Sequence, residues 1–295
     1  MAKVSVIIPT RNRRGLLPKA IRSVLDQTHS PVELIVVDDG SEDGTSEMLA
    51  SSFPQVKALR QANWGCASAS NVGIRNSTGD YLTVLGDDDL LEPQALARAS
   101  DALDQDPGLS LVYTDSRTFL DGTPGTLTLE PSVRAPEAPG ALAAALYRNS
   151  TLPICSTMIR RKDREGTGWF REILRINEDT DFLIRFLLGS RARWLPESSC
   201  RIRIHPGGKS RKPLAAAEAL FRSQSDLWDH LPELRALLGE DGKRRLDDLA
   251  SDLLAAGLKT ASLGNVWQAL RHLGWNSLAP GILRRTAGSL LRTAP

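Results

Sequence analysis

The sequence predicts an α/β fold, in which a mostly parallel sheet carries helices on both faces and a helical region follows at the C-terminal end. Two observations support the sheet. Short apolar runs rich in β-branched residues alternate with helical patterns over the first hundred residues, and such continuous runs are typical of parallel strands buried on both faces. The helical region is indicated by a change of composition near Lys212, after which Leu, Ala and Arg dominate with helical periodicity.

The elements follow in order along the chain. Strands are expected at 4–9, 32–37, 56–59 and 81–85, with helices at 16–26, 45–50 and 67–75 between them. The pattern then loosens. The second half is expected to hold a strand at 109–113, a loop or hairpin at 121–140, a helix at 141–148, a strand at 154–159, an amphipathic helix at 179–188 and a strand near Ile202 and Ile204 with one wet face.

Composition limits the class of protein. The chain has 295 residues, of which 41% are hydrophobic, so a large core is available. A net charge of only +2 gives no indication of a nucleic-acid partner. Three cysteines far apart in the sequence lack metal-ligand spacing and are interpreted as buried thiols in a reducing compartment. No signal peptide precedes the first strand and no apolar run is long enough to cross a bilayer, so a cytoplasmic protein is expected.

Carboxylates end two of the expected strands. Asp38 and Asp39 follow one apolar run, and Asp87, Asp88 and Asp89 follow another. Adjacent carboxylates repel by roughly 4 kcal/mol per close pair at an effective dielectric constant near 20, a cost that a cation or polar ligand offsets. Because parallel strands end at one edge of the sheet, a nucleotide site with Mg²⁺ or Mn²⁺ is predicted there.

Four segments together resemble the family-2 glycosyltransferases. They are 4–13 (VSVIIPTRNR), 33–41 (ELIVVDDGS), the pair 63–65 (NWG) and 71–74 (NVGI), and 85–89 (LGDDD) followed by Pro93. The resemblance is strong over 3–103 and looser to about 210. It implies a GT-A fold and inverting transfer of a sugar from a nucleotide donor, with residues 1–110 binding the nucleotide sugar and 111–212 binding the acceptor. The composition of residues 213–295 separately predicts three or four helices.

The resemblance also implies roles for single residues. Asp39 would contact the base, Asp87 the ribose and Asp88 the metal, and His205 would reach the metal or the diphosphate unless it is structural. Gly86 stands where many members carry Asp, and Ser70 stands where Arg is frequent; the contact to the donor phosphate is then either lost or supplied by Arg75 or Arg11. The remaining residues assigned to the nucleotide-sugar site are Pro9, Thr10, Arg11, Asn12, Ser41, Asn71 and Gly73.

The acidic cluster before the amphipathic helix is the expected source of the catalytic base. An inverting transfer needs one carboxylate to take the proton of the acceptor hydroxyl, and the resemblance makes Asp179 that base. Acids at a helix N-terminus are also stabilised by the helix dipole. Asp181 is expected to pair with Arg185 four residues later and so to be structural, and the aromatic pair 169–170 either stacks on an acceptor sugar or lies in the core.

The end of the chain is basic and apolar. From residue 270 onward it carries four arginines and no acids, interleaved with Leu and Trp. This segment either packs on the catalytic domain or a second subunit as a homodimer, or lies peripherally on the inner face of an anionic membrane.

The sequence therefore predicts a metal-dependent inverting glycosyltransferase. The expected donor is a nucleotide sugar, with UDP as the nucleotide, and the acceptor is a glycan, a lipid-linked intermediate or a small molecule. Two alternatives remain open. A catalytically silent nucleotide-binding module is favoured by Gly86 and Ser70, and a sugar nucleotidyltransferase would need a Gly-rich basic loop that residues 10–15 match poorly.

Overall fold

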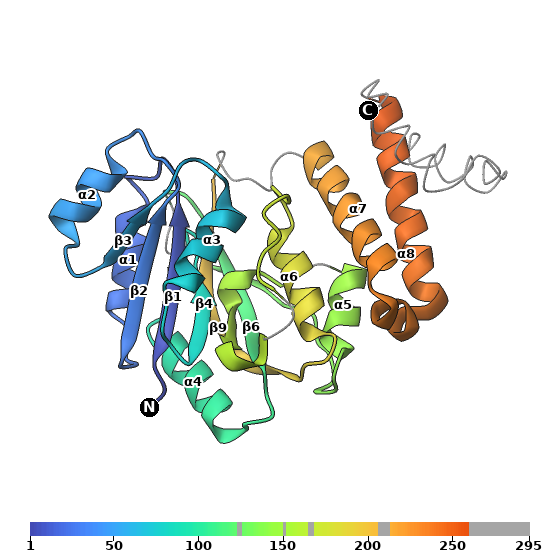
Figure 1. Ribbon diagram of the computed structural model, residues 1–295, viewed down its shortest axis with the longest axis horizontal. Coiled ribbons are helices and arrows are strands. Elements are labelled where there is room, and N and C mark those ends of the chain that lie inside the picture. The colour runs from blue at the N-terminus through green and yellow to red at the C-terminus, as the bar shows by residue number, and fades with distance from the viewer. Residues whose placement is uncertain (123–125, 150–151, 165–167, 206–212, 260–295) are drawn as a thin grey trace. The chain divides into compact units, whose positions relative to one another are not determined.

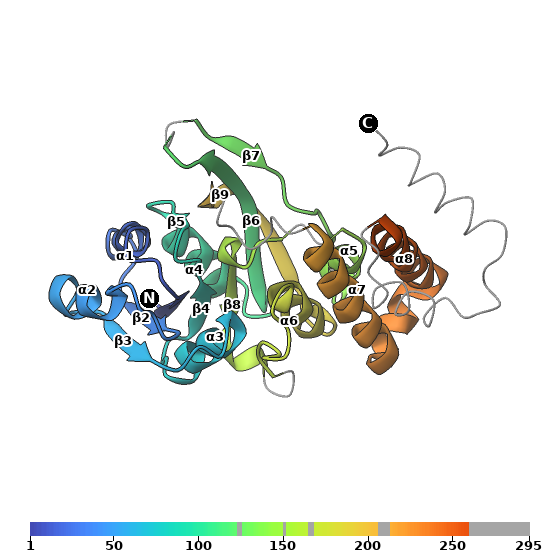
Figure 2. The same cartoon turned by 90° about the horizontal axis from the view of Figure 1, so that it is seen from above.

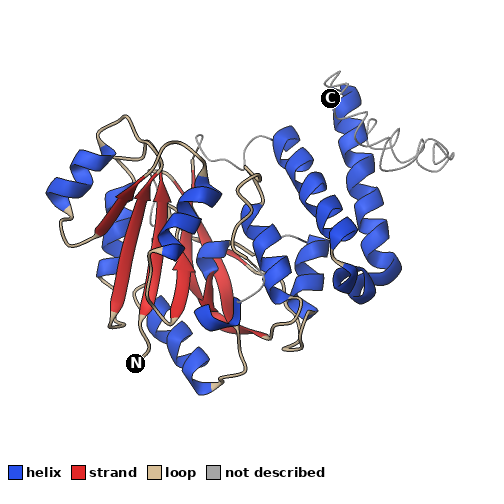
Figure 3. Ribbon diagram, viewed as in Figure 1, coloured by secondary structure: helices blue, strands red, loops and turns tan. Residues whose placement is uncertain are grey.

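The computed structural model describes residues 1–122, 126–149, 152–164, 168–205 and 213–259. The chain divides into two compact units, Met1–Pro206 and Gly207–Pro295. The first unit holds the sheet, and the second holds helices (Figure 1, Figure 3).

Nine strands of the described residues form one sheet, in the order β3-β2-β1-β4-β8-β6-β9-β5, with β7 paired to β6. The strands are β1 Val4–Thr10, β2 Val32–Asp38, β3 Lys57–Arg60, β4 Tyr81–Val84, β5 Leu90–Leu91, β6 Leu111–Leu120, β7 Thr128–Glu130, β8 Thr157–Arg160 and β9 Ala192–Ile204. The helices of the first unit are α1 Leu17–Leu25, α2 Thr45–Ser52, α3 Cys66–Arg75, α4 Ala95–Gln105, α5 Ala141–Asn149 and α6 Glu178–Leu187.

The first half of the sheet is parallel. β1 lies between β2 and β4, with Val4 opposite Val32 and Ile7 opposite Val84, and every residue of β1 is buried. Continuous β-branched sequence suits this central position because both faces of the strand are covered. The four strands expected here are confirmed, and their carboxyl ends share one edge.

The second half of the sheet is mixed. β8 runs antiparallel between β4 and β6, whereas β6 and β9 run parallel to each other. The strand near Ile202 and Ile204 is much longer than expected, since β9 begins at Ala192. The start of β9 is not recognisable in the sequence because Pro196 interrupts the strand pattern. The pairing of β9 with β6 also shifts register between Thr114 and Ser116 of β6.

Helices cover both faces of the sheet, as expected. Figure 2 shows α1 and α4 on one side and α3 and α6 on the other. α1 and α4 pack apolar residues such as Ile21 and Leu103 against alternate residues of β1. On the opposite face α3 approaches closely at Gly73, where an added Cβ would lie 2.4 Å from Ile7 Cγ2.

The second unit contains α7, Pro213–His230, and α8, Pro232–Lys259. Phe221 of α7 packs with Leu246 and Leu253 of α8, and Gly239 breaks the regular path of α8 with a φ of 53°. The predicted C-terminal helical region is confirmed for these residues. The basic segment from residue 270 onward lies outside the described residues, so its membrane and dimer contacts stay predictions. Within the described residues, no helix has the length and apolarity needed to cross a membrane.

Candidate active site

Asp88 and His205 meet at the carboxyl edge of the sheet. The turn after β4 places Asp88 Oδ2 2.9 Å from His205 Nε2, although 117 residues separate the two in sequence. β9 delivers the histidine, and Arg203 of the same strand donates from Nε to the Asp88 carbonyl at 3.0 Å. Figure 1 shows β4 and β9 within one sheet. A carboxylate oxygen and an imidazole nitrogen thus converge as the sequence predicted, while their service as metal ligands stays a prediction.

Asp87 faces the end of β1. Thr10 Oγ1 donates to Asp87 Oδ2 at 2.8 Å, and Arg13 Nε lies 3.9 Å from Oδ1. Burial, then the charge of Asp88, raises the pKa of Asp87 to about 6, against the opposing effects of Thr10, Arg13 and the Arg11 amide. Thr10, Arg11 and Asp87 are therefore brought together at one point.

Asp89 points into the protein. Its Oδ1 accepts the Arg203 N–H at 3.0 Å, and burial together with the charge of Asp88 raises its pKa to about 7. It does not cap α4, which begins after Gln94. The position of Asp89 explains why residue 86 is a glycine. A Cβ at residue 86 would lie 2.7 Å from Asp89 Oδ2. The glycine thus makes room for a buried third carboxylate.

Asp39 holds the loop that follows β3. Its Oδ1 accepts hydrogen bonds from Gln61 Nε2 and the Trp64 N–H, both at 2.8 Å, and its Oδ2 accepts the Gly65 N–H at 2.9 Å. The side chain is buried, and its own N–H donates to the Thr10 carbonyl at 2.8 Å. Asp39 therefore joins the ends of β1, β2 and β3, where a base contact was predicted.

The loops around Asp39 are held by short polar contacts. Asn12 has a φ of 54°, donates its N–H to Ser41 Oγ at 2.9 Å and accepts the Glu42 N–H at 2.8 Å. Arg11 donates from Nη1 to the amide oxygen of Asn63 at 3.0 Å, in the amide orientation that satisfies both groups. Pro9 is buried within β1. The structure thus groups Pro9, Arg11, Asn12 and Ser41 near Asp39.

Asn71 and Gly73 have roles inside the protein. Asn71 Nδ2 donates to the Phe170 carbonyl and to Glu172 Oε1, both at 2.9 Å, and its Oδ1 accepts the Phe170 N–H at 3.1 Å. Gly73 permits the close packing of α3 on β1. These contacts tie α3 to the segment before α6, and the assignment of Asn71 and Gly73 to the donor stays a prediction.

Asp179 lies in the first turn of α6, where its Oδ1 accepts the Thr180 N–H at 2.7 Å. The charges of Asp179 and Asp89 both affect the thiol of Cys155. The pKa of that thiol is raised by its hydrogen bond with Cys200, by burial and by the charges of Asp89 and Asp179. The role of Asp179 as the catalytic base stays a prediction.

Asp181 is structural, as expected. It is fully buried, and its Oδ2 lies 2.9 Å from Arg185 Nε and 3.0 Å from Arg171 Nε. This pair of arginines fixes the start of α6. Phe170 belongs to the core, with its ring centroid 4.9 Å from that of Phe182.

Two arginines at the end of β9, Arg201 and Arg203, form ion pairs within the protein. Arg203 is 4% exposed, and its Nη1 lies 2.8 Å from Asp121 Oδ1. Arg201 pairs with Glu92 at 2.7 Å. The alternation of Arg with Ile in the sequence does not show which partner each arginine meets.

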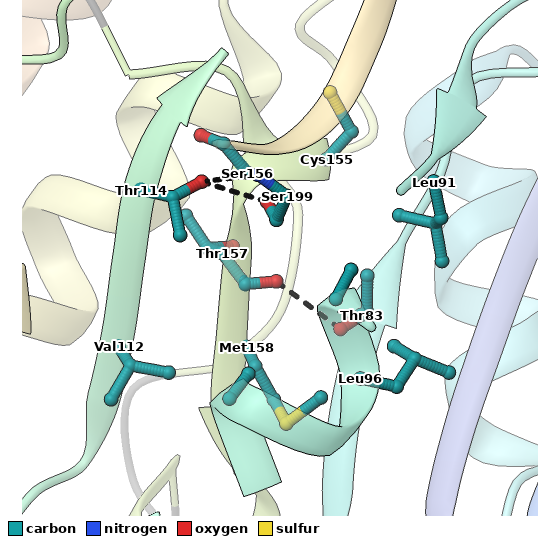
Figure 4. A pocket seen from close by; sticks show the side chains of 12 residues that line it. Thr83, Leu91, Leu96, Val112, Thr114, Cys155, Ser156, Thr157, Met158 and Ser199 are labelled. Carbon is teal, nitrogen blue, oxygen red and sulfur yellow. Dashed lines mark hydrogen bonds between the residues drawn. The ribbon is translucent and has the colours of Figure 1, made fainter. Parts of the chain in front are cut away.

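A small cavity lies beneath the site, between β4, β6, β8 and α4 (Figure 4). Its volume is about 20 Å³, which suits roughly one water molecule. Thr114 Oγ1 and Ser199 Oγ on its wall are 2.8 Å apart, and Thr83 Oγ1 donates to the Thr157 carbonyl at 3.2 Å (Figure 4). The cavity is too small for a nucleotide, and the donor site stays predicted at the sheet edge.

Cys155, on the cavity wall, places its sulfur 3.3 Å from that of Cys200, and both thiols are buried. The interpretation of the cysteines as buried thiols is confirmed for this pair, whereas Cys66 is partly exposed. Their closeness in space was not visible from a separation of 45 residues.

Comparison with known proteins decides the family. Residues 5–167, more than half of the chain, match the model for glycosyl transferase family 2. The chain belongs to glycosyl transferase family 2. The resemblance predicted from the four segments is thereby confirmed.

The chain is similar in sequence to two relatives over part of their length. It is 28% identical over 184 residues to an uncharacterized glycosyltransferase of Haemophilus influenzae, covering 62% of each chain. It is 37% identical over 119 residues to the chondroitin synthase of Escherichia coli, covering 39% of this chain and 17% of that protein. The chain spans less than two thirds of the length of both relatives.

Solved structures share the fold. S. aureus TarS 1-349 in complex with UDP-GlcNAc has a TM-score of 0.66 at 18% identity and covers 92% of this chain and 79% of its own. The mannosyltransferase PcManGT from Pyrobaculum calidifontis, in complex with GDP-Man and Mn²⁺, has a TM-score of 0.59 at 20% identity and covers 98% and 86%. The GT-A-type fold class is confirmed for this family-2 chain.

Proposed function

We propose that the chain is a metal-dependent inverting glycosyltransferase that moves a sugar from a nucleotide donor to an acceptor hydroxyl. One observation carries the proposal. Asp88 Oδ2 lies 2.9 Å from His205 Nε2 at the edge of the sheet where Asp39 follows β2 and Asp87 follows β4. Carboxylates gathered at the carboxyl ends of parallel strands suit a polar, charged ligand.

A divalent cation fits this edge. Carboxylate oxygen suits Mg²⁺ and Mn²⁺, and imidazole nitrogen suits transition metals such as Mn²⁺. Asp88 and His205 would hold it. Among the described residues no group of three or more His, Cys, Asp and Glu side chains forms a complete site, so donor oxygens and water would supply the remaining ligands. When bound, the cation stabilises the negative charge that develops on the leaving diphosphate.

The donor is proposed to lie with its base against Asp39 and its ribose near Asp87. Asp39 offers carboxylate oxygens at the end of β2, and Arg11, Asn12 and Ser41 line the neighbouring loops. The TarS structure is a complex with UDP-GlcNAc and the PcManGT structure one with GDP-Man. We propose UDP as the donor nucleotide, with residues 1–110 as the donor half and 111–212 as the acceptor half.

Asp179 is proposed as the base. As the acceptor oxygen forms its bond to the anomeric carbon, the bond from that carbon to the diphosphate breaks and the hydroxyl proton passes to the Asp179 carboxylate. The first turn of α6 favours the ionised carboxylate, and the ion pairs of Asp181 hold that turn in place. The acceptor is proposed to be a glycan, a lipid-linked intermediate or a small molecule.

Calorimetry tests the donor site. UDP is titrated into wild type, Asp88→Asn and the matched control Asp101→Asn, with and without Mn²⁺; Asp101 is exposed on α4. We expect wild type and the control to bind UDP more tightly with Mn²⁺, and Asp88→Asn to lose that gain. UDP binding that ignores both Mn²⁺ and Asp88 would refute the metal assignment.

Turnover is tested separately, by following UDP release from a panel of UDP-sugars with added acceptors. We expect Asp179→Asn to bind UDP as wild type does and to lose turnover by roughly 10²–10⁴-fold, the usual contribution of a general base. Wild type that binds UDP without releasing it from any donor, or Asp179→Asn with undiminished turnover, contradicts the catalytic proposal.

A further inference from the structure

The peptide of Trp64 sits between the two halves of the proposed site. Its N–H donates to Asp39 Oδ1 at 2.8 Å, and its carbonyl accepts a hydrogen bond from Arg175 Nη1, also at 2.8 Å. The indole itself is 61% exposed. The backbone of Trp64, and not its side chain, therefore links Asp39, the proposed contact of the nucleobase, to Arg175, which lies four residues before Asp179.

Gly65 accommodates the arginine. Its φ of +101° is open to glycine and strained for other residues, and a Cβ at this position would lie 2.3 Å from Arg175 Nη1. The Gly65 N–H also donates to Asp39 Oδ2 at 2.9 Å. The backbone conformation therefore favours glycine at this position, and the missing Cβ leaves the space in which the guanidinium lies across the loop.

The segment that carries Arg175 is held at both ends. Asn71 binds the backbone of Phe170 on the N-terminal side, and the buried Asp181 anchors the start of α6 on the C-terminal side. Between these anchors, the Trp64 carbonyl is the one hydrogen-bond partner that Arg175 has among the described residues. A shift of the loop at Trp64 is therefore passed to a short, tethered segment that ends at Asp179.

We propose that Arg175 is a positioning residue that couples the nucleotide loop, residues 61–65, to the catalytic base Asp179. The inference rests on the proposed function and deepens it. Donor binding at Asp39 holds the loop, the loop holds Arg175, and Arg175 sets the N-terminal turn of α6 for proton transfer. Because Arg175 is assigned no contact with the nucleotide, its removal leaves donor affinity intact while turnover falls.

Kinetics test this coupling with four proteins: wild type, Arg175→Ala, Arg175→Lys and the control Arg22→Ala, an exposed arginine on α1. We expect Arg175→Ala to keep its thermal midpoint, its UDP Kd and its donor KM within twofold. Its kcat falls roughly 10–100-fold, the scale of a misplacement of about 1 Å. Arg175→Lys recovers part of the loss because an ammonium group also donates to a carbonyl, and Arg22→Ala matches wild type.

Gly65→Ala adds a double-mutant cycle. If both residues act through one contact, the loss of kcat in Gly65→Ala with Arg175→Ala is smaller than the product of the two single losses. An Arg175→Ala protein with wild-type kcat overturns the proposal. A tenfold loss of UDP affinity makes Arg175 a donor ligand, and a lowered thermal midpoint with no lysine rescue makes it merely structural; either result also overturns it.

Hydrogen exchange supplies a readout that needs no turnover. UDP with Mn²⁺ is expected to slow amide exchange in peptides spanning residues 168–182 of wild type, and not in those of Arg175→Ala. Equal slowing in both proteins refutes the coupling even if wild type shows no transferase activity. Failure of the proposed function appears differently, as wild type that binds UDP and protects this segment without transferring sugar.

Discussion

Glu33 offers a quantitative test of what stabilises the parallel half of the sheet. The carboxylate of this β2 residue accepts Ser5 Oγ at 2.5 Å and the Thr78 N–H at 2.7 Å, with Lys3 Nζ 3.3 Å away. Burial alone would raise its pKa, but these bonds outweigh burial and lower the pKa from 4.5 to about 2. At about 1.4 kcal/mol per pKa unit, the folded state favours the ionised form by about 3 kcal/mol.

The lowered pKa of Glu33 sets the direction in which the stability of the protein changes with pH. The stabilisation is fully present above pH 4.5 and is lost as the pH falls from 4.5 toward 2. We therefore expect Glu33→Gln to lower the free energy of unfolding by about 3 kcal/mol at pH 7 and by about 1.5 kcal/mol at pH 3. Urea unfolding followed by circular dichroism measures both values, with the exposed Glu47→Gln as the control.

The expected stabilisation depends on the charge of Glu33. A Glu33→Gln effect of the same size at pH 7 and pH 3 would show that shape, not ionisation, provides the stabilisation. A carboxyl carbon NMR titration adds an independent check, because the Glu33 resonance should titrate near pH 2 and not near pH 4.5.

Three further outcomes are expected. Gly86→Asp should lower the thermal midpoint and not raise turnover, because its Cβ would lie 2.7 Å from Asp89 Oδ2; a stable variant with tighter metal-dependent UDP binding contradicts this. Asp181→Asn should lower the free energy of unfolding in urea by about 3–5 kcal/mol, since it removes the buried carboxylate that pairs with Arg171 and Arg185, and a loss below 1 kcal/mol would contradict this. Cys155 and Cys200 should react with a thiol reagent only after unfolding, because both thiols are buried and the raised pKa of Cys155 further disfavours its thiolate; rapid labelling of three thiols in the native protein would be the opposite result.

The first, parallel half of the sheet could be predicted closely from the sequence because its signals are local. The apolar run of β1 defines a buried strand by itself, and Asp39 and Asp88 follow their strands directly. Where parallel strands end at one edge, the position of each acidic residue follows from the strand before it. The family motifs added the roles and the expected partner His205.

The second, mixed half of the sheet was less predictable because its strand order depends on contacts between residues far apart in the sequence. β9 pairs with β6 across a register shift and contains Pro196, so alternation is visible only at Ile202 and Ile204. The pairing of Cys155 with Cys200, and the hydrogen bond from Arg175 to Trp64, join segments whose closeness has no signal in spacing. Such contacts depend on the packing of whole elements and not on local pattern.

The distance in sequence between Asp88 and His205 has a consequence for synthesis of the protein. With a separation of 117 residues and elongation at about 5–20 residues per second, roughly 6–23 s pass between the emergence of the carboxylate and that of the imidazole. During this interval β1, β2, β3 and β4 can already pair on the ribosome, while β4 waits for β8 to cover its edge. The nucleotide loop is thus available to fold early on the nascent chain, and the candidate metal pair is completed last.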